Sequence, residues 1–219
     1  MGQKVNPISF RVGVNKSWKS MWFAERGEYK KLLFEDLELR RLLEDRLKLS
    51  GVHEINIERL PKSMTIRAKV SRPGVVIGRG GQGIEEVKKL VLEKLGLKSK
   101  DPNLPKIDIL VEEVKYPDQS AKLIGQRIVA ELERRLPHRR VVNKTMDRVI
   151  AAGAKGIKVV LSGRIGGADI SRREKYHRGS VPTQSLRSNV EYAQESALLK
   201  RGYVGVKVWI YKGEGQDAT

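Results

Sequence analysis

Apolar residues recur at helical spacing in the first part of the chain and then alternate with polar residues. Leucines return every three or four positions between residues 28 and 49, and Gly51 follows, so this stretch predicts an amphipathic helix that ends at the glycine. Residues 55–58 and 64–70 then alternate between apolar and polar side chains around a turn at residues 61–63. Alternation of period two is typical of strands, so these stretches predict a β-hairpin with one apolar and one charged face.

A glycine-rich segment follows the predicted hairpin. The Pro73-Gly74 pair interrupts the strand pattern and leaves only residues 75–77 as a short extended stretch before the glycines. Apolar residues return at helical spacing over residues 84–95 and predict a helix, and a further strand is expected at residues 107–111. The predicted order is therefore helix, strand, strand, glycine loop, helix, strand.

The periodicity changes near residue 116, where Pro117 interrupts the pattern and a second domain is expected to begin. Two helices are predicted there, at residues 119–136 and 139–152, with Pro137 between them. The second helix has an apolar stripe made of Val142, Met146, Val149 and Ile150. Strands are expected at residues 157–161 and 204–210, with a glycine turn at 163–167 and a polar strand or loop running towards Arg178 between them.

These patterns predict an α+β protein in four parts. Residues 1–27 are expected to form a basic arm with aromatic anchors, or a terminus docked on the core by those aromatics. Residues 28–115 form the first domain, residues 116–212 a second two-layer α/β domain, and residues 213–219 a disordered tail.

The charge of the chain points to a polyanionic partner. The 219 residues include 44 Lys and Arg against 26 Asp and Glu, a formal net charge of +18. Such an excess is costly self-repulsion unless a polyanion neutralises it, so nucleic acid is the first partner to consider. No apolar run approaches the roughly 18 residues of a spanning helix, and no signal-peptide segment opens the chain, so we expect a cytoplasmic protein with no membrane partner.

The glycine segment is the most informative candidate site. Gly78, Arg79, Gly80 and Gly81 form a G-x-x-G turn at the start of a helix, where glycine lets a sugar-phosphate backbone approach and Arg79 can pair with a phosphate. An ordinary glycine-rich helix start remains open. The same glycines with Gly83 also fit the dinucleotide pattern G-x-G-x-x-G, but that fold needs a full parallel strand before the loop and repeated βαβ units, and a hairpin precedes this loop instead.

Basic residues form a second candidate site on the helix predicted at residues 139–152. Arg140, Lys144 and Arg148 are spaced by four residues and therefore share one side, which suits a strip that tracks phosphates, although a merely solvated face remains open. The whole cluster comprises Arg134, Arg135, His138, Arg139, Arg140, Lys144 and Arg148. Other residues expected to face RNA are Lys4, Arg11, Arg164, Arg172, Arg173, Lys175 and Arg178. Trp209 and Tyr211 fit packing against a helix better than stacking on bases.

Catalysis finds little support in the sequence. The chain has no cysteine, which excludes disulfides, thiol nucleophiles and cysteine-based zinc sites, and the three histidines are far apart. The acidic residues are scattered through periodic segments, and nothing assembles a triad, a carboxylate pair or a metal-ligand set by spacing. We therefore expect no enzyme, no cofactor and no metal, with an acidic-metal nuclease as the alternative because such sites assemble only in three dimensions.

The order of elements around the glycine loop resembles a type II KH domain, αββααβ. The whole chain is similar to the family of the bacterial small-subunit ribosomal protein three. The matching segments are residues 1–7 (MGQKVNP), 72–78 (RPGVVIG), 132–135 (LERR), 153–159 (GAKGIKV), 162–168 (SGRIGGA) and 205–210 (GVKVWI). They occur in family order and span almost the full length, whereas residues 192–203 depart from the family pattern.

That resemblance implies a structural constituent of the small-subunit head that is cytoplasmic, ribosome-bound and attached to 16S ribosomal RNA. It implies proteins ten and fourteen as neighbours. With proteins four and five, the chain would line the channel through which messenger RNA (mRNA) enters, guide the mRNA, and help resist or unwind its structure. A KH-type RNA-binding regulator free of the ribosome is the alternative.

In that family, basic residues early in the second helix of the C-terminal domain are assigned to gripping mRNA. Arg139 and Arg140 match two of those positions. The third position holds Asn143, with Lys144 beside it, and a helix turns by about 100° per residue, so Lys144 points in another direction.

Overall fold

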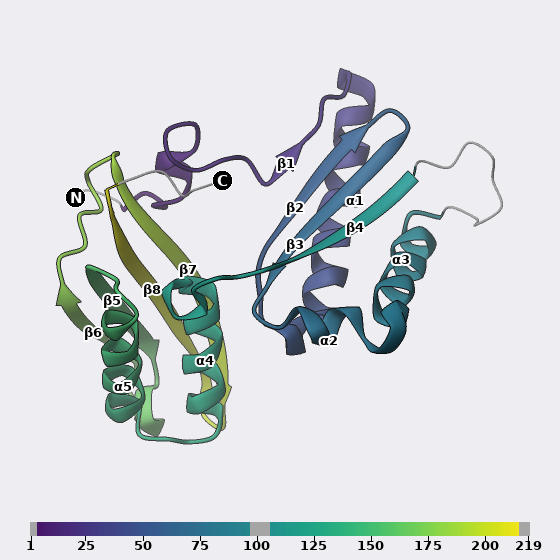
Figure 1. Ribbon diagram of the computed structural model, residues 1–219. Coiled ribbons are helices and arrows are strands. Elements are labelled where there is room, and N and C mark those ends of the chain that lie inside the picture. Colours follow the sequence, from purple (N-terminus) through teal and green to yellow (C-terminus); the bar gives the residue numbers. More distant parts are fainter. Residues whose placement is uncertain (1–3, 97–105, 215–219) are drawn as a thin grey trace. The chain divides into compact units, whose positions relative to one another are not determined.

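The computed structural model describes residues 4–96 and 106–214, and these fall into two compact units (Figure 1). The N-terminal unit is Trp18–Lys115, and the C-terminal unit combines Met1–Ser17 with Tyr116–Thr219. The residues expected to form one basic arm are therefore divided between the two units. Most of the tail expected at residues 213–219 lies outside the described residues, but Gly213 and Glu214 end the last strand rather than a disordered segment.

The N-terminal unit is a sheet with helices packed against it. The strands are β1 (Ser20–Met21), β2 (Val52–Leu60), β3 (Ser63–Val70) and β4 (Lys106–Glu113), in spatial order β1-β2-β3-β4. The pair β2–β3 is the antiparallel hairpin that the alternation predicted, and β1 and β4 run parallel to their neighbours. The helices are α1 (Arg26–Arg46), α2 (Pro73–Ile77) and α3 (Gln82–Lys94).

Apolar side chains from the helices and the sheet of this unit form one core. Leu39 and Leu43 of α1 and Val91 of α3 pack with Ile57 and Ile66 of the central strands. Two leucines on the predicted stripe of α1, Leu33 and Leu37, are exposed instead. The helix stripe was therefore predicted correctly only in its C-terminal half, where α1 lies over the sheet.

A buried carboxylate joins the start of this unit to α1. Asp36 is 2% exposed and accepts hydrogen bonds from Trp22 Nε1 at 2.8 Å, Ser20 Oγ at 3.2 Å and Arg59 Nε at 2.8 Å. Trp22 is the aromatic that docks this segment, because Trp18 and Phe23 are 68% and 91% exposed. Docking of the terminus on the core by its aromatics therefore holds for Trp22 and not for Trp18 or Phe23.

The segment after the hairpin is helical, not extended as the sequence predicted. Pro73 occupies the first turn of α2, where its missing N–H costs nothing and its fixed φ suits a helix. The prediction took Pro73-Gly74 as a break in a strand. The same pair serves as the start of a short helix that ends at Ile77, with Gly78 directly after it.

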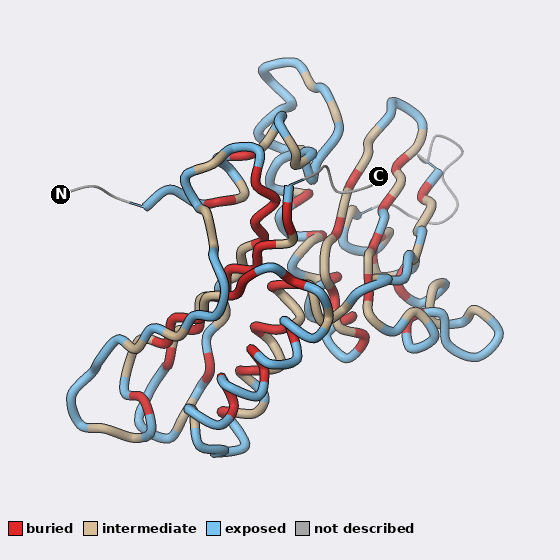
Figure 2. The backbone as a smooth tube through the Cα atoms, turned by 60° about the vertical axis from the view of Figure 1, so that its left-hand side comes forward, coloured by how far each residue is buried: buried red, intermediate tan, exposed pale blue. Residues whose placement is uncertain are grey.

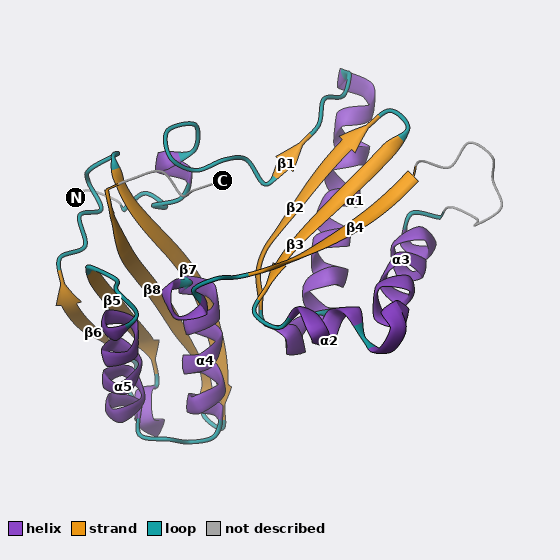
Figure 3. Cartoon of the chain, viewed as in Figure 1, coloured by secondary structure: helices purple, strands orange, loops and turns teal. Residues whose placement is uncertain are grey.

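The C-terminal unit is a four-stranded antiparallel sheet with two helices on one face (Figure 3). The helices are α4 (Ala121–Glu133) and α5 (His138–Ala151), and the strands are β5 (Gly156–Gly163), β6 (Arg172–Gly179), β7 (Ser188–Leu199) and β8 (Gly202–Glu214), in spatial order β6-β5-β8-β7. Together the two units confirm the predicted α+β class. Five short 3-10 helices complete the described structure: η1 (Ser9–Arg11), η2 (Lys48–Ser50), η3 (Arg79–Gly81), η4 (Pro117–Gln119) and η5 (Ile165–Gly167).

The core of the C-terminal unit lies between the helices and the sheet. Ile124 and Ile128 of α4 and Val142 of α5 pack with Val159 and Val208 of the central strands, and buried positions run along the strands and along one side of each helix (Figure 2). Ile150, expected in the α5 stripe, is 37% exposed, and Val141 and Thr145 are buried in its place.

The opposite face of this sheet carries a smaller cluster. Trp209 and Tyr211 are 7% and 8% exposed and pack with Val160 and Val190. Both aromatics are packed rather than free for bases, as expected. They lie on the face away from α4 and α5, however, so the expectation that they pack against a helix is wrong.

The strand β7 was not predicted. It forms a long hairpin with β8, joined at Lys200 and Arg201, and its buried residues include the polar Ser188, Asn189 and Glu191. A strand with buried polar positions lacks the apolar alternation on which the prediction depended.

Candidate nucleic-acid interface

The glycine loop connects α2 to α3 at the surface of the N-terminal unit. Gly78, Gly80 and Gly81 have φ angles of +69°, +63° and +82°, in the region that favours glycine. Gly78, Arg79 and Gly80 are exposed, and within the described residues no carboxylate pairs with Arg79. Glycines on both sides of an exposed arginine leave the backbone N–H groups open to a sugar-phosphate chain.

Gly83 holds the two helices of this loop close together. A Cβ at this position would lie 2.2 Å from the carbonyl oxygen of Val76 and 3.0 Å from that of Ile77. A hollow of about 200 Å³ lies beside this contact, lined by residues of α1, η2, α2 and α3 that include Leu49 and Val75. The last glycine of the dinucleotide pattern therefore has a packing role between α2 and α3.

The basic side of α5 faces solvent. Val142, Met146 and Val149 are buried on the other side, and Arg140 and Lys144 are exposed. Arg139, Asn143 and Arg148 are exposed as well, and no carboxylate among the described residues pairs with Arg140, Lys144 or Arg148. The structure thus keeps a row of unneutralised cations at the position where the sequence predicted one.

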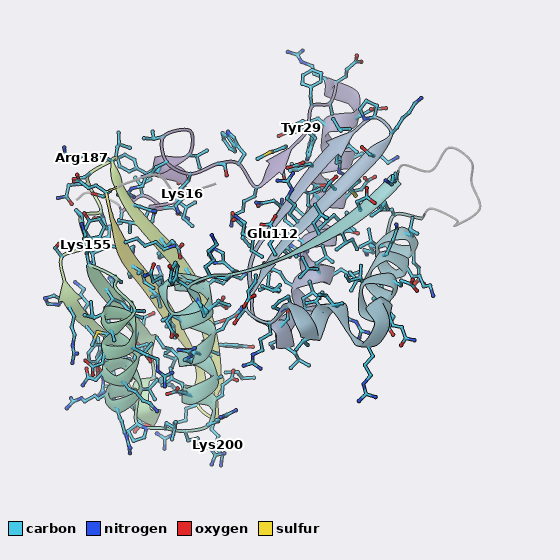
Figure 4. The ribbon with its side chains drawn as sticks, in the orientation of Figure 1. Lys16, Tyr29, Glu112, Lys155, Arg187 and Lys200 are labelled. Atoms are coloured by element: carbon cyan, nitrogen blue, oxygen red, sulfur yellow. The ribbon has the colours of Figure 1, made fainter. Side chains whose placement is uncertain are left out.

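One end of the C-terminal unit gathers further basic residues from three loops. The loop between α4 and α5 carries Arg134 and Arg135, both exposed. The turn between β7 and β8, marked by Lys200 in Figure 4, lies at the same end, because the Leu198 N–H donates to Glu133 Oε1 at 3.4 Å. Arg164 joins this group, since its Nη1 donates to the carbonyl of Arg201 at 3.5 Å. Sequence reasoning missed Lys200 and Arg201, because their proximity depends on the unpredicted hairpin.

Two cations of β6 are already partnered inside the protein. Arg172 pairs with Glu174 at 2.7 Å, and Arg178 pairs with Asp147 of α5. Glu174 also accepts a hydrogen bond from Tyr176 and lies 3.2 Å from His138 Nε2. The hydrogen bond from Tyr176 lowers the pKa of Glu174, helped by His138 and Arg172, and burial raises the pKa of Tyr176. Glu174 therefore stays ionised and attaches β6 to the start of α5.

Arg11 does not face RNA, contrary to the sequence-based expectation. It is 0% exposed, and burial lowers its pKa. Its guanidinium donates to the carbonyl oxygens of Pro7 at 2.9 Å, Pro182 at 3.3 Å, Thr183 at 3.1 Å and Ser185 at 2.8 Å. A buried cation is stable here because backbone carbonyls replace its water, so Arg11 fastens the N-terminal segment to the loop before β7.

Neither a metal site nor a membrane-spanning helix is found within residues 4–96 and 106–214. No group of three or more His, Asp or Glu side chains in that part of the chain could hold a metal ion. No helix there is both long enough and apolar enough to cross a bilayer.

Comparison with known proteins decides the family. Residues 38–119 match the family model described as KH domain, and residues 128–210 match that of ribosomal protein S3, C-terminal domain. The small ribosomal subunit protein uS3 of Persephonella marina is 45% identical over 214 residues, which cover 98% of this chain and 91% of the relative. The uS3 proteins of Bacillus thuringiensis and Oenococcus oeni are 44% and 42% identical, over 98% and 99% of this chain and 94% and 81% of theirs. The chain belongs to the uS3 family.

As a uS3 protein, the chain is a structural constituent of the small ribosomal subunit and not an enzyme. Its N-terminal unit contains a KH domain, and the RNA-binding character inferred from charge and from the glycine loop agrees with that family. Residues 192–203, which depart from the family pattern, lie in β7, the turn and the start of β8.

Proposed function

We propose that the basic side of α5 contacts mRNA where it enters the small subunit, and that it guides the mRNA and resists its duplexes. The observation that carries this proposal is the row of exposed cations without carboxylate partners, Arg140, Lys144 and Arg148, on a helix whose other side is fully packed. Such a row binds phosphates without reading sequence. Arg134, Arg135 and Arg139 extend the row around the N-terminal end of the helix.

The remaining parts of the proposed function concern placement in the particle. The protein binds 16S ribosomal RNA, is cytoplasmic and ribosome-bound, adjoins proteins ten and fourteen, and lies near proteins four and five at the channel. The glycine loop, Gly78 to Gly81, binds RNA backbone through its N–H groups and Arg79. Family membership and the exposure of these residues support this assignment.

The test uses reconstituted ribosomes that carry Arg139→Ala with Arg140→Ala. We expect normal incorporation into the small subunit and slower progress through structured mRNA, because two phosphate contacts are lost and the helix stays packed. Arg187→Ala is the control, since this side chain is 81% exposed and lies on the loop before β7, away from α5. Loss of incorporation would show that the cluster is an assembly contact, and unchanged progress would show that it is only a solvated face.

A second pair of variants tests the position of the third cation. Asn143→Lys combined with Lys144→Asn moves one charge by a single residue and leaves the net charge unchanged. Because the helix turns by about 100° per residue, this change redirects the charge without altering its amount. Faster unwinding would place the contact at residue 143, and slower unwinding would place it at residue 144.

A further inference from the structure

Lys158 of β5 lies on the face of the C-terminal sheet that α4 and α5 do not cover. Its neighbours Val159 and Leu161 belong to the core beneath the helices, and side chains alternate between the two faces along a strand. The residue paired with Lys158 on β8 is Trp209, and Lys158 Nζ lies 5.2 Å from the centre of its ring. This contact holds the amine at one place on the sheet, where it is half-buried and still within reach of small molecules.

Cations from two other segments surround this amine. His177 is paired with Lys158 on β6, and Lys175 and Arg173 follow on the same face at alternate positions of that strand. Lys4 of the N-terminal segment donates a hydrogen bond to Lys158. No carboxylate within residues 4–96 and 106–214 pairs with Lys4, Lys158, Arg173 or Lys175. The amine therefore lies in a cluster of unneutralised positive charge.

These surroundings favour an amine without a proton. The pKa of Lys158 is lowered to about 8, first by burial, then by the hydrogen bond from Lys4, and then by the charges of Lys4, Lys175 and Arg173. At about pH 7.5, roughly one in four amines with this pKa carries no proton, against about one in a thousand at the ordinary lysine value. Burial and a neighbouring cation make a lysine nucleophilic at neutral pH in this way.

The same cations suit an acyl donor whose leaving group is anionic. Arg173 and Lys175 are exposed and lie about 7 Å apart along β6, and Lys4 is exposed as well. In an acyl phosphate, a phosphate group with up to about two negative charges is joined directly to the carbonyl carbon that an amine attacks. Binding of the phosphate by these cations brings that carbon to Lys158. Three cations outnumber the charges of one phosphate, so the surroundings of the amine remain positive.

We propose that Lys158 is a site of acylation by acyl phosphates, in which Lys4, Arg173 and Lys175 bind the phosphate group of the donor. The lone pair of Lys158 Nζ attacks the carbonyl carbon and forms the C–N bond, and the bond between that carbon and the phosphate oxygen breaks. Inorganic phosphate leaves with the electron pair, and the nitrogen gives its proton to water. The product is a neutral amide, so the reaction needs no oxidant or reductant. The proposed function of α5 is independent of it.

The test incubates the full chain with acetyl phosphate and measures acetylation of each lysine by peptide mass spectrometry. At about pH 7.5 we expect Lys158 to react about tenfold faster than the exposed Lys144 and Lys200, because the gain in unprotonated amine exceeds the loss of nucleophilicity at lower basicity. Its rate should level off above about pH 8. A rate no faster than that of Lys144, or one that keeps rising to about pH 10, overturns the inference.

Variants of β6 test the role of the cations. Arg173→Gln with Lys175→Gln removes two charges beside Lys158. The matched control, Arg172→Gln with Arg178→Gln, removes two charges from the same strand on the helix side, where both are already paired. N-hydroxysuccinimidyl acetate, an uncharged acetyl donor, measures the reactivity of the amine alone, and equal unfolding temperatures of the two variants exclude misfolding.

The informative quantity is the acetylation rate of Lys158 with acetyl phosphate divided by its rate with the uncharged donor. We expect this ratio to fall about tenfold at low salt in Arg173→Gln with Lys175→Gln, because two charges that attract the phosphate are lost. The control should keep the wild-type ratio. An equal ratio in wild type and in the variant without Arg173 and Lys175 would mean that the cations do not bind the donor, and it would overturn the inference.

Discussion

Replacement of Arg11 by Met should release the N-terminal segment from the C-terminal unit. Its Nη2 donates to the loop before β7, at 2.8 Å to Ser185 O, 3.1 Å to Thr183 O and 3.3 Å to Pro182 O, whereas the bond to Pro7 O at 2.9 Å stays within the segment. A hydrogen bond that involves a charged group contributes about 1.5–3 kcal/mol. Nη2 carries two N–H groups, so its bonds to the loop give about 3–6 kcal/mol, and partial hydration of the freed carbonyls reduces the loss to about 3 kcal/mol.

Amide hydrogen exchange measures this loss locally. The N–H groups of Arg11 and Gly13 are bonded within the segment, to the carbonyls of Ile8 at 3.0 Å and Lys16 at 2.9 Å. We expect their protection to fall by roughly a hundredfold in Arg11→Met, since about 1.4 kcal/mol corresponds to a factor of ten. Amides of β2 and β3 in the N-terminal unit should keep their protection and serve as an internal reference.

Arg187→Met is the matched control, because Arg187 lies on the same loop but is 81% exposed, and exposed ion pairs contribute at most about 1 kcal/mol. Unchanged protection of residues 4–17 in Arg11→Met would refute the reasoning. In that case the apolar contacts of the segment, not the guanidinium, would fasten it to the sheet.

Three further predictions concern substitutions of Asp36, Gly83 and Lys158. Asp36→Ala should cost the N-terminal unit about 3 kcal/mol in urea unfolding, because Trp22 and Arg59 would lose a buried acceptor while Arg59 keeps Glu35 at 2.8 Å. A loss below about 1 kcal/mol would mean that water replaces the carboxylate. Gly83→Ala should displace α2 from α3, since the new Cβ would lie 2.2 Å from Val76 O. We expect weaker RNA crosslinking at Arg79 and an unchanged C-terminal unit, and crosslinking at the wild-type level would contradict the prediction. Lys158 has a folded pKa of about 8, below its ordinary 10.5, so folding disfavours its charged form and stability should rise with pH between those values as the folded state loses the proton first. Lys158→Gln should therefore be more stable than the wild type at neutral pH and lose that advantage above about pH 8. A stability advantage independent of pH would exclude charge as its cause. The other ionisable groups on the same side of the sheet are Lys4, Arg173, Lys175, His177 and Lys207.

Local patterns predicted the parts of the fold whose burial follows sequence period. The alternation around residues 61–63 gave the β2–β3 hairpin, and the apolar residues of α5 predicted its buried side, with the cations left on the other. The two strands of the hairpin follow each other directly in the sequence, and α5 packs on a sheet face that is apolar over a wide area, so neither prediction needed knowledge of one particular distant residue.

Features that depend on distant partners could not be predicted. The sequence predicted Arg11 to be an exposed, RNA-facing cation, because the carbonyl groups that bind its side chain lie 171–174 residues further along the chain. The strand β7 buries Glu191 because the start of α4 supplies a backbone N–H, a partner that its own sequence does not reveal. The helix α2, by contrast, could have been predicted, since proline in a first helical turn is a known signal.

The C-terminal unit is built from the two ends of the chain, so its first segment is synthesised long before the rest of the unit. Arg11 leaves the translating ribosome well before Pro182 and Ser185 do, and at about 5–20 residues per second the 171–174 residues between them take roughly 10–35 s. The N-terminal unit is continuous in sequence and can finish folding within that interval. During the same interval residues 4–17 are a solvated, positively charged segment without their docking partners. Docking of this segment is therefore a late step in maturation, and until it occurs the newborn chain presents Lys4 and Arg11 to any RNA nearby.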